Sequence, residues 1–509
     1  MKKHSTIHGE GSFLSFVISN SKNRRLLWIL LGAVTLEFIL FKLLYPYPSL
    51  FSDSYSYIFA AAIHADVNIW PIGYSKFLQF FPLFTRSTFL LVGFQYFFLE
   101  LSALCFFYTI LYFYDLGKIS RRILMGFLFF NPLLIYVSNY ITSDTLFIGL
   151  SLLWVTQLIW IIQRPHPSQI LLQGVLLLLA FTVRYNAMYY PLIAAFAFLI
   201  SAHRPVWKVL GLLAGPLLII PFIIYSSNAA RDLTGTAQFP LLGGWQWGNN
   251  ALYIREYIDV QDADLPTPET VKLDHLAQDF FRTVPPDQRD LPNYVANYFF
   301  RNANAPLRKY MHLNYPARDE YSNLVRWGKS SVVYGDYGKT LIRQHPGAFA
   351  QHFILVNTKN YFLPPLEQLK VYNMGLDSIW ERGRSWFNLP TVHVSAATPY
   401  LQEPLLLIFP PLFAGLNLFF LVAIGSLLTS QPVSLSQGFV RTVLLIGCLL
   451  ALNFGFSVFA NIIVIRYQIF PLLQFLTFGL VIWEKAVAGH RKTVLQTEQS
   501  TDTQLYKLS

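Results

Sequence analysis

Cysteine is almost absent from this chain, which contains only Cys105 and Cys448 among 509 residues. Both lie in apolar runs, so the sequence excludes a disulfide framework and a cysteine-based metal site. Charged residues are also scarce, at 13% of the chain, whereas soluble domains carry about 25%. This composition therefore argues against a large soluble protein. A charged side chain within an apolar run is costly to bury, so each one is a candidate functional residue.

Apolar and aromatic residues are plentiful instead, at 54% and 17% of the chain. They form repeated apolar runs of roughly 20 residues, the length that crosses a membrane as a helix. The sequence therefore predicts an α-helical polytopic membrane protein with a bundle of about ten transmembrane helices. The expected spans are residues 26–45, 88–113, 123–137, 145–162, 170–183, 192–201, 209–225, 404–428, 442–460 and 467–483.

The net charge of +11 is concentrated in short segments and does not indicate a nucleic-acid partner. Lysine and arginine cluster at one side of successive spans, which is the positive-inside pattern of membrane proteins. The pattern predicts cytoplasmic termini, a first apolar run that is a retained anchor, and long hydrophilic segments on the outer face. The expected layout is a cytoplasmic tail at 1–25, spans one to seven at 26–225 with an outer, candidate catalytic loop at 46–87, an extracytoplasmic and mostly helical soluble region at 226–402, spans eight to ten at 403–483, and a cytoplasmic tail at 484–509.

The outer loop after the first span carries Asp53, the first acidic residue on the predicted outer face. A carboxylate at the membrane interface suits a general base, although residues 52–58 are also a plausible helix start that Asp53 would cap. The same two interpretations apply to Asp144, which precedes the fourth span. Residues 53–63 predict a short interfacial helix with tyrosine and phenylalanine anchors, and Lys42 is expected to extend to the interface.

Further residues of the outer segments are candidate substrate contacts, with solvent exposure or membrane anchoring as the alternative. They are Tyr57, His64 and Asp66 in the outer loop, and Trp245 and Trp247 in a glycine-rich loop near the start of the soluble region. Glu100 lies near the middle of the second span, where a buried acid is either functional or hydrogen-bonded to a neighbouring helix.

Two of the arginines on the predicted outer face adjoin apolar spans, where the positive-inside bias disfavours them. Arg184 follows the fifth span and precedes Tyr185, and Arg466 precedes Tyr467 at the start of the last span. A guanidinium recognises phosphate oxygens in a planar, bidentate way, so the pair suits a donor phosphate site, with Tyr185 and Tyr467 as further donor contacts. A salt bridge to one of the two aspartates, or contact with lipid headgroups, explains them equally well. The outer carboxylates are compatible with a divalent cation, yet no ligand cluster has the spacing of a metal site.

The order of these features resembles the GT-C membrane glycosyltransferases, above all the bacterial members related to protein mannosyltransferases and to lipid A aminoarabinose transferases. The resemblance rests on Asp53 in a long first outer loop, Asp144 before the fourth span, the Arg184-Tyr185 turn, Arg466-Tyr467 followed by Pro471, and the segment HPGAF at 345–349. It covers most of the chain as an architecture.

The resemblance implies an inverting transfer of a sugar from a polyprenyl-phosphate donor to an unidentified extracytoplasmic acceptor, in the bacterial inner membrane. By this resemblance Asp53 corresponds to the catalytic acid of the first outer loop and Asp144 to the acid of the second. Arg466 corresponds to the phosphate-binding arginine. The implied partners are the lipid-linked sugar, the acceptor and membrane lipid, and no certain cofactor is implied.

Other classes fit the same composition. An O-antigen ligase or polymerase also uses lipid-linked sugars, but its essential residues would fall within residues 226–402. A lipid-linked sugar transporter or flippase would need polar residues in several spans and usually repeat symmetry, whereas these spans hold few acids and bases apart from Glu37 and Glu100. A non-catalytic assembly protein would leave the outer acids and arginines unexplained.

Overall fold

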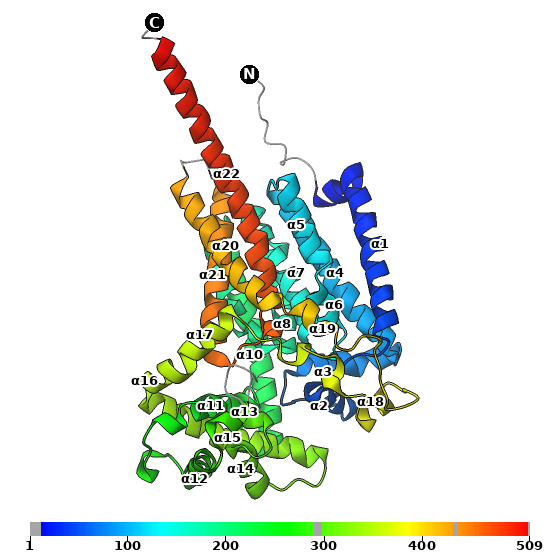
Figure 1. The fold of residues 1–509 in the computed structure, drawn as a ribbon, viewed down its shortest axis with the longest axis vertical. Coiled ribbons are helices and arrows are strands. Elements are labelled where there is room, and N and C mark those ends of the chain that lie inside the picture. The colour runs from blue at the N-terminus through cyan, green and yellow to red at the C-terminus, as the bar shows by residue number, and fades with distance from the viewer. Residues whose placement is uncertain (1–11, 290–297, 431–434, 507–509) are drawn as a thin grey trace.

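Helices make up almost all of the structure, a computed structural model that describes residues 12–289, 298–430 and 435–506. Within these ranges there is no β-strand, and only isolated bridges pair extended backbone. Figure 1 shows a long bundle of apolar helices above a smaller helical layer. The ends of the two expected tails, residues 1–11 and 507–509, lie outside the described residues.

Eight helices of the described ranges are long and apolar enough to cross a membrane, so the chain is an α-helical multi-pass membrane protein. They are α1 (Ser21–Leu44), α4 (Thr88–Phe113), α5 with α6 (Lys118–Phe129 and Pro132–Ser138), α7 (Asp144–Gln163), α10 (Pro205–Thr234), α19 with α20 (Gln402–Leu406 and Phe409–Thr429), α21 (Gln437–Ala460) and α22 (Ile469–Tyr506). Two shorter apolar helices, α8 (Ser168–Val183) and α9 (Tyr190–Ile200), stand where the fifth and sixth spans were expected. Every expected span thus coincides with helix, while ten crossings stay a prediction.

Helix α22 continues to Tyr506, well beyond the expected end of the last span at residue 483. Two further departures from the expected boundaries have local reasons. The third expected span is broken between α5 and α6, where the Asn131 side chain accepts the N–H of Leu133 and Pro132 opens the second helix. Helix α10 continues to Thr234, beyond the expected end at residue 225, and stops at Gly235, whose φ of +83° forms a left-handed cap. The last turns of α10 therefore carry the chain beyond the bundle.

The outer loop folds into two short helices, α2 (Ser52–Ala62) and α3 (Ile72–Phe80). The helix expected at residues 53–63 is confirmed as α2, but its expected tyrosine anchors are wrong because Tyr55 and Tyr57 are buried. The exposed apolar side chains follow α3 instead, with Phe84 86% exposed.

Lys42, near the end of α1, does not extend to the interface as expected. Its ammonium is buried and donates to Asn139 Oδ1 at 3.0 Å. A segment far along the chain packs over the end of α1, where the Ala397 N–H donates to the carbonyl of Leu44. Tertiary packing at this end of α1 thus encloses an amine that an isolated span would extend into water.

A second hydrophobic core lies below the bundle in Figure 1, in the helical layer at residues 243–354 that we call the cap. Its elements are α11 (Gly243–Leu252), α12 (Pro268–Thr283), α13 (Tyr298–Arg301), α14 (Pro306–Asn314), α15 (Glu320–Gln344), α16 (Pro346–Phe349) and the turn η7 (Ala350–Ile354). Helices α11 and α15 pack so closely that a Cβ on Gly244 or Gly338 would overlap the backbone of the other helix. The expected glycine-rich loop is therefore wrong, and this stretch is a packed helix.

Candidate functional site

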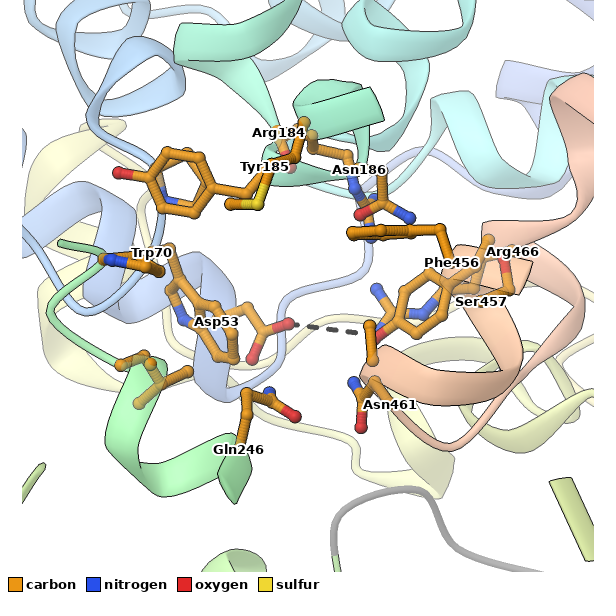
Figure 2. A pocket seen from close by; sticks show the side chains of 18 of the residues that line it. Asp53, Trp70, Arg184, Tyr185, Asn186, Gln246, Phe456, Ser457, Asn461 and Arg466 are labelled. Carbon is orange, nitrogen blue, oxygen red and sulfur yellow. Dashed lines mark hydrogen bonds and ion pairs between the residues drawn. The ribbon is translucent and has the colours of Figure 1, made fainter. Parts of the chain in front are cut away.

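A pocket of about 480 Å³ lies between the cap and the end of the bundle that faces it. Its walls come from α2, the start of α7, the turn after α8, α11, and the segment that joins α21 to α22. Figure 2 shows Asp53 in this pocket, with Trp70 on one side and Phe456 and Arg466 on the other. The pocket thus gathers segments from both halves of the chain.

Asp53 and Asp144 lie at helix starts without capping them. The N-cap of α2 is Phe51, whose N–H donates to the hydroxyl of Ser54 at 3.2 Å. Helix α7 begins at Asp144 itself, and this carboxylate accepts a hydrogen bond from the Thr142 hydroxyl at 2.9 Å. The capping interpretation of both aspartates is therefore wrong, and both carboxylates line the pocket.

Asp144 joins the two arginines that the sequence singled out. Arg184 donates to one carboxylate oxygen of Asp144, and Arg466 donates to the other at 3.1 Å. The side chains are largely buried, with 2% of Asp144, 13% of Arg184 and 4% of Arg466 exposed. The salt bridge that was the alternative to phosphate binding is present, and it fixes the spacing of the two guanidiniums.

Arg466 also faces two further carboxylates. Its Nη2 lies 3.9 Å from Asp53 Oδ2, and its Nε lies 3.9 Å from Glu367 Oε2. Glu367 in turn pairs with Arg301 at 2.7 Å. We call this set the arginine–carboxylate cluster; it consists of Asp53, Asp144, Glu367, Arg184, Arg301 and Arg466. Its carboxylates and guanidiniums are equal in number, so the cluster with every group ionised carries no net charge.

The environment of the cluster changes the proton affinity of Asp53. Burial raises the pKa of Asp53 above its usual range, although the positive charges of Arg466 and Arg301 act in the opposite direction. The negative charges of Asp144 and Glu367 add to the increase. A raised pKa makes this carboxylate a stronger base than an exposed aspartate, as a general base requires.

Aromatic rings support the two guanidiniums. The ring centroid of Tyr467 lies 4.9 Å from Cζ of Arg184 and 5.2 Å from Cζ of Arg466. Burial raises the pKa of Tyr467, so its phenol stays neutral. Tyr57 and Tyr185 also line the pocket, as the sequence proposed for ligand contacts.

The segment that carries Arg466 is held by two asparagines that the sequence did not single out. Asn357 of α17 (Leu355–Phe362) donates to three backbone carbonyls at the end of α21 and accepts the N–H of Ile463 at 3.0 Å. Asn250 of α11 donates to two more carbonyls there, at 3.2 and 3.3 Å. No sequence motif distinguishes these two asparagines from others in helices, so their role could not be predicted.

Three of the proposed contact residues lie outside the pocket. Asp66 is exposed and pairs with Lys76 at 3.4 Å, and His64 is exposed as well. Trp245 is fully buried in the cap, so its proposed contact role is wrong because its indole fills the cap core. Trp247, two residues further on, does line the pocket.

Other residues have roles that sequence reasoning missed or left open. Glu367 and Arg301 reach the cluster from the region expected to be soluble, and no local pattern separates them from the other charges there. Glu367 has a φ of +51°, a left-handed conformation that is uncommon for glutamate. Glu100 is 2% exposed on α4 and is not part of the pocket lining.

In the described part of the chain, no group of three or more histidine, cysteine, aspartate or glutamate side chains is placed to hold a metal ion. Each carboxylate of the cluster lies within 3.9 Å of a guanidinium, a partner that competes with a bound cation. The divalent cation with which the sequence is compatible gains no support from this arrangement.

These features define the class of the protein: an α-helical multi-pass membrane protein with a charged pocket between its helical bundle and its cap. No family model, no curated protein and no solved structure matches this chain. The function is therefore argued from the pocket alone.

Proposed function

We propose that this protein is a membrane glycosyltransferase of the GT-C type, which moves a sugar from a polyprenyl-phosphate donor to an extracytoplasmic acceptor with inversion. The observation that carries the proposal is a single pocket in which Asp53 stands beside Arg184 and Arg466. A base for the acceptor and cations for a phosphate leaving group are what such a transfer needs. The positive-inside charge pattern supports an outer location for this pocket, with both termini cytoplasmic. The bacterial inner membrane follows from the resemblance alone.

The pocket also has an apolar side that suits the lipid part of the donor. Phe456, Phe459 and Met188 line it, and Phe459 is 46% exposed and Met188 42%. Because Phe456 and Phe459 belong to the end of an apolar helix, α21, a prenyl chain lying along that helix would reach the pocket from the membrane. Its phosphate would then lie near the guanidiniums.

In the proposed reaction the acceptor's oxygen bonds to the anomeric carbon while its proton passes to the Asp53 carboxylate. The bond between the anomeric carbon and the phosphate oxygen breaks, and its electron pair stays with polyprenyl phosphate. Arg466 and Arg184 stabilise the charge that grows on that phosphate, an interaction that is stronger in the transition state than before it. Asp144 acts as a positioning residue, since it holds both guanidiniums.

The test is release of polyprenyl phosphate from a panel of lipid-linked sugars by purified protein in nanodiscs. Asp53→Asn keeps the shape of the side chain and removes the base, so turnover should fall about 10²- to 10⁴-fold while the donor still binds. Asp66→Asn is the matched control, because Asp66 lies in the same loop outside the pocket. Full turnover by Asp53→Asn would exclude this base, and failure of wild type to bind any polyprenyl phosphate would overturn the proposed function.

A reaction like that of the O-antigen ligases is the second candidate, because Arg301 and Glu367 bring the region 226–402 into the cluster. It uses the same class of donor but relies on residues of that region. It predicts that Arg301→Gln abolishes turnover and that Asp53→Asn retains it, whereas the first proposal requires Asp53→Asn to lose turnover.

A further inference from the structure

The Arg466 guanidinium makes a hydrogen bond of ordinary length to Asp144 but only a longer-range ion pair with Asp53. Its Nη1 donates to Asp144 at 3.1 Å, an ordinary hydrogen-bond length. Its Nη2 lies 3.9 Å from Asp53 and 3.5 Å from the Tyr467 hydroxyl, and its Nε has no hydrogen-bond partner among the described residues. The side of the guanidinium that faces Asp53 (Figure 2) is therefore attracted by charge and not fixed by a short hydrogen bond.

Asp53 is the least confined carboxylate of the cluster. Its side chain is 15% exposed, against 2% for Asp144 and 4% for Glu367. Its single hydrogen bond within the described ranges comes from the adjacent Ser52 hydroxyl at 3.3 Å. Asp53 lines the pocket and Glu367 does not, so of the two carboxylates at 3.9 Å from Arg466 only Asp53 would face a ligand there.

We propose that the Asp53 carboxylate competes with a ligand's phosphate for Arg466, and that protonation of Asp53 releases the guanidinium to that phosphate. The identity of the ligand, a polyprenyl phosphate, rests on the proposed function. In that reaction the acceptor's proton neutralises Asp53 while the electron pair of the broken carbon–oxygen bond adds one negative charge to the phosphate. Arg466 thus exchanges one anionic partner for another, and the charge around it stays constant.

The groups that face Asp53 come from several elements of the fold. They are Arg466 and Tyr467 before α22, Arg301 of α13, Asp144 of α7, Glu367 of the turn η8 (Glu367–Leu369), and Tyr57 of α2 itself. Because Asp144 is held between two guanidiniums and Asp53 by none at hydrogen-bond distance, Asp53 gains a proton more readily than Asp144. Its raised pKa, caused first by burial, agrees with this assignment.

The test is binding of a polyprenyl monophosphate to the full chain in nanodiscs, for wild type and Asp53→Asn, between about pH 5 and pH 8. A phosphate monoester itself titrates near pH 6, so the quantity to compare at each pH is the ratio of the two dissociation constants. Removing a negative charge beside the ligand should make Asp53→Asn bind about tenfold more tightly at pH 8. The ratio should approach one as the pH falls, because protonated Asp53 is then as neutral as asparagine.

Controls separate this proposal from loss of structure and from failure of the proposed function. Asp66→Asn should bind like wild type at every pH, and Asp53→Ala supplies a second neutral variant. Arg466→Lys keeps the charge but loses the planar fork, so it should weaken binding with either residue at position 53. Equal or weaker binding by both neutral variants at pH 8, at an unchanged melting temperature, would overturn the competition. Equal binding of wild type and Asp53→Asn at pH 8 would overturn the competition but leave the proposed function standing, whereas no binding of any polyprenyl phosphate by wild type would overturn both.

Discussion

Two buried clusters of carboxylates and arginines in this protein differ in how completely their charged groups are paired. In the cap, Asp274 accepts two hydrogen bonds from Arg255 at 2.5 and 2.8 Å, one from Tyr337 at 2.7 Å and one from Gln278 at 2.9 Å. Each oxygen of this fully buried carboxylate therefore has two donors. The arrangement joins α12 to α15 and leaves no position for a ligand.

The arginine–carboxylate cluster is less completely buried, with 15% of the Asp53 side chain exposed against 1% for Asp274, and it is incompletely paired. Arg466 has one short contact, to Asp144, and approaches Asp53 and Glu367 only at 3.9 Å. It borders a pocket of about 480 Å³, which Asp274 does not line. We therefore use incomplete pairing beside a cavity, and not buried charge alone, as the criterion for the candidate site in this fold.

The largest expected effect on stability tests the structural side of this comparison. Asp274→Ala leaves Arg255 buried without its counter-ion, so the free energy of unfolding should fall by about 3–5 kcal/mol. Hydrogen exchange of helix α15 in the full chain, measured at increasing urea, reports on the cap because Tyr337 of this helix donates to Asp274. Turnover lost at unchanged stability would show instead that the cap cluster is a site.

The next effect tests the pocket. Arg466→Gln removes a cation from the place where phosphate charge grows, and turnover should fall about 10²- to 10³-fold. Arg255→Gln is the matched variant in the cap, and it should lower stability while folded molecules keep their turnover. Arg441→Gln, at the other end of α21, controls for loss of positive charge. If Arg466→Gln and Arg255→Gln change the same quantity, the distinction between the two clusters fails.

Much of the architecture follows from the sequence because length and polarity decide it locally. An apolar run long enough to cross a membrane forms a helix wherever it packs, so all the expected spans coincide with helices. The two aspartates and two arginines were also recognisable, since each is a charge at the end of an apolar run, where ordinary membrane helices have no need of one. The structure brings these four residues to one pocket.

The remaining features depend on partners that are distant in the chain. Glu367, Arg301 and Asn357 acquire their roles from segments far from them in sequence, and no periodicity records such a pairing. Lys42 shows the same dependence on distant partners. A lysine at the end of an isolated span is expected to extend to the interface, but here packing buries its ammonium against Asn139. The sequence could locate candidate charged residues, but it could not show which of them are fully paired by hydrogen bonds and counter-ions in the folded protein.

A smaller effect would sharpen the comparison by loosening the pocket without touching a charge. Asn357→Leu removes the side chain that holds the segment before Arg466 and leaves several buried backbone groups unpaired. The cost should be about 1–3 kcal/mol. Hydrogen exchange of residues 461–467 should become faster while exchange in the cap helix α15 stays unchanged.

Asn357→Asp is the informative companion. It keeps the acceptor for the Ile463 N–H but sets a carboxylate oxygen against the carbonyls at the end of α21, so exchange should rise at least as much as in Asn357→Leu. Unchanged exchange in both variants would mean that the geometry of Arg466 is set by Asp144 and not by this asparagine.

The smallest expected effect concerns an ion pair outside both clusters. Asp66 lies in the same loop as Asp53 and pairs with Lys76 at 3.4 Å, but 58% of its side chain is exposed. Exposed pairs contribute little, because water screens the charges and both side chains lose freedom. Asp66→Asn should therefore change the free energy of unfolding by less than about 0.5 kcal/mol and leave phosphate binding as in wild type. A loss of binding comparable to that of Arg466→Gln would mean that the ligand extends beyond the pocket to this side of the loop, and that exposure does not separate ligand-binding charges from the others in this protein.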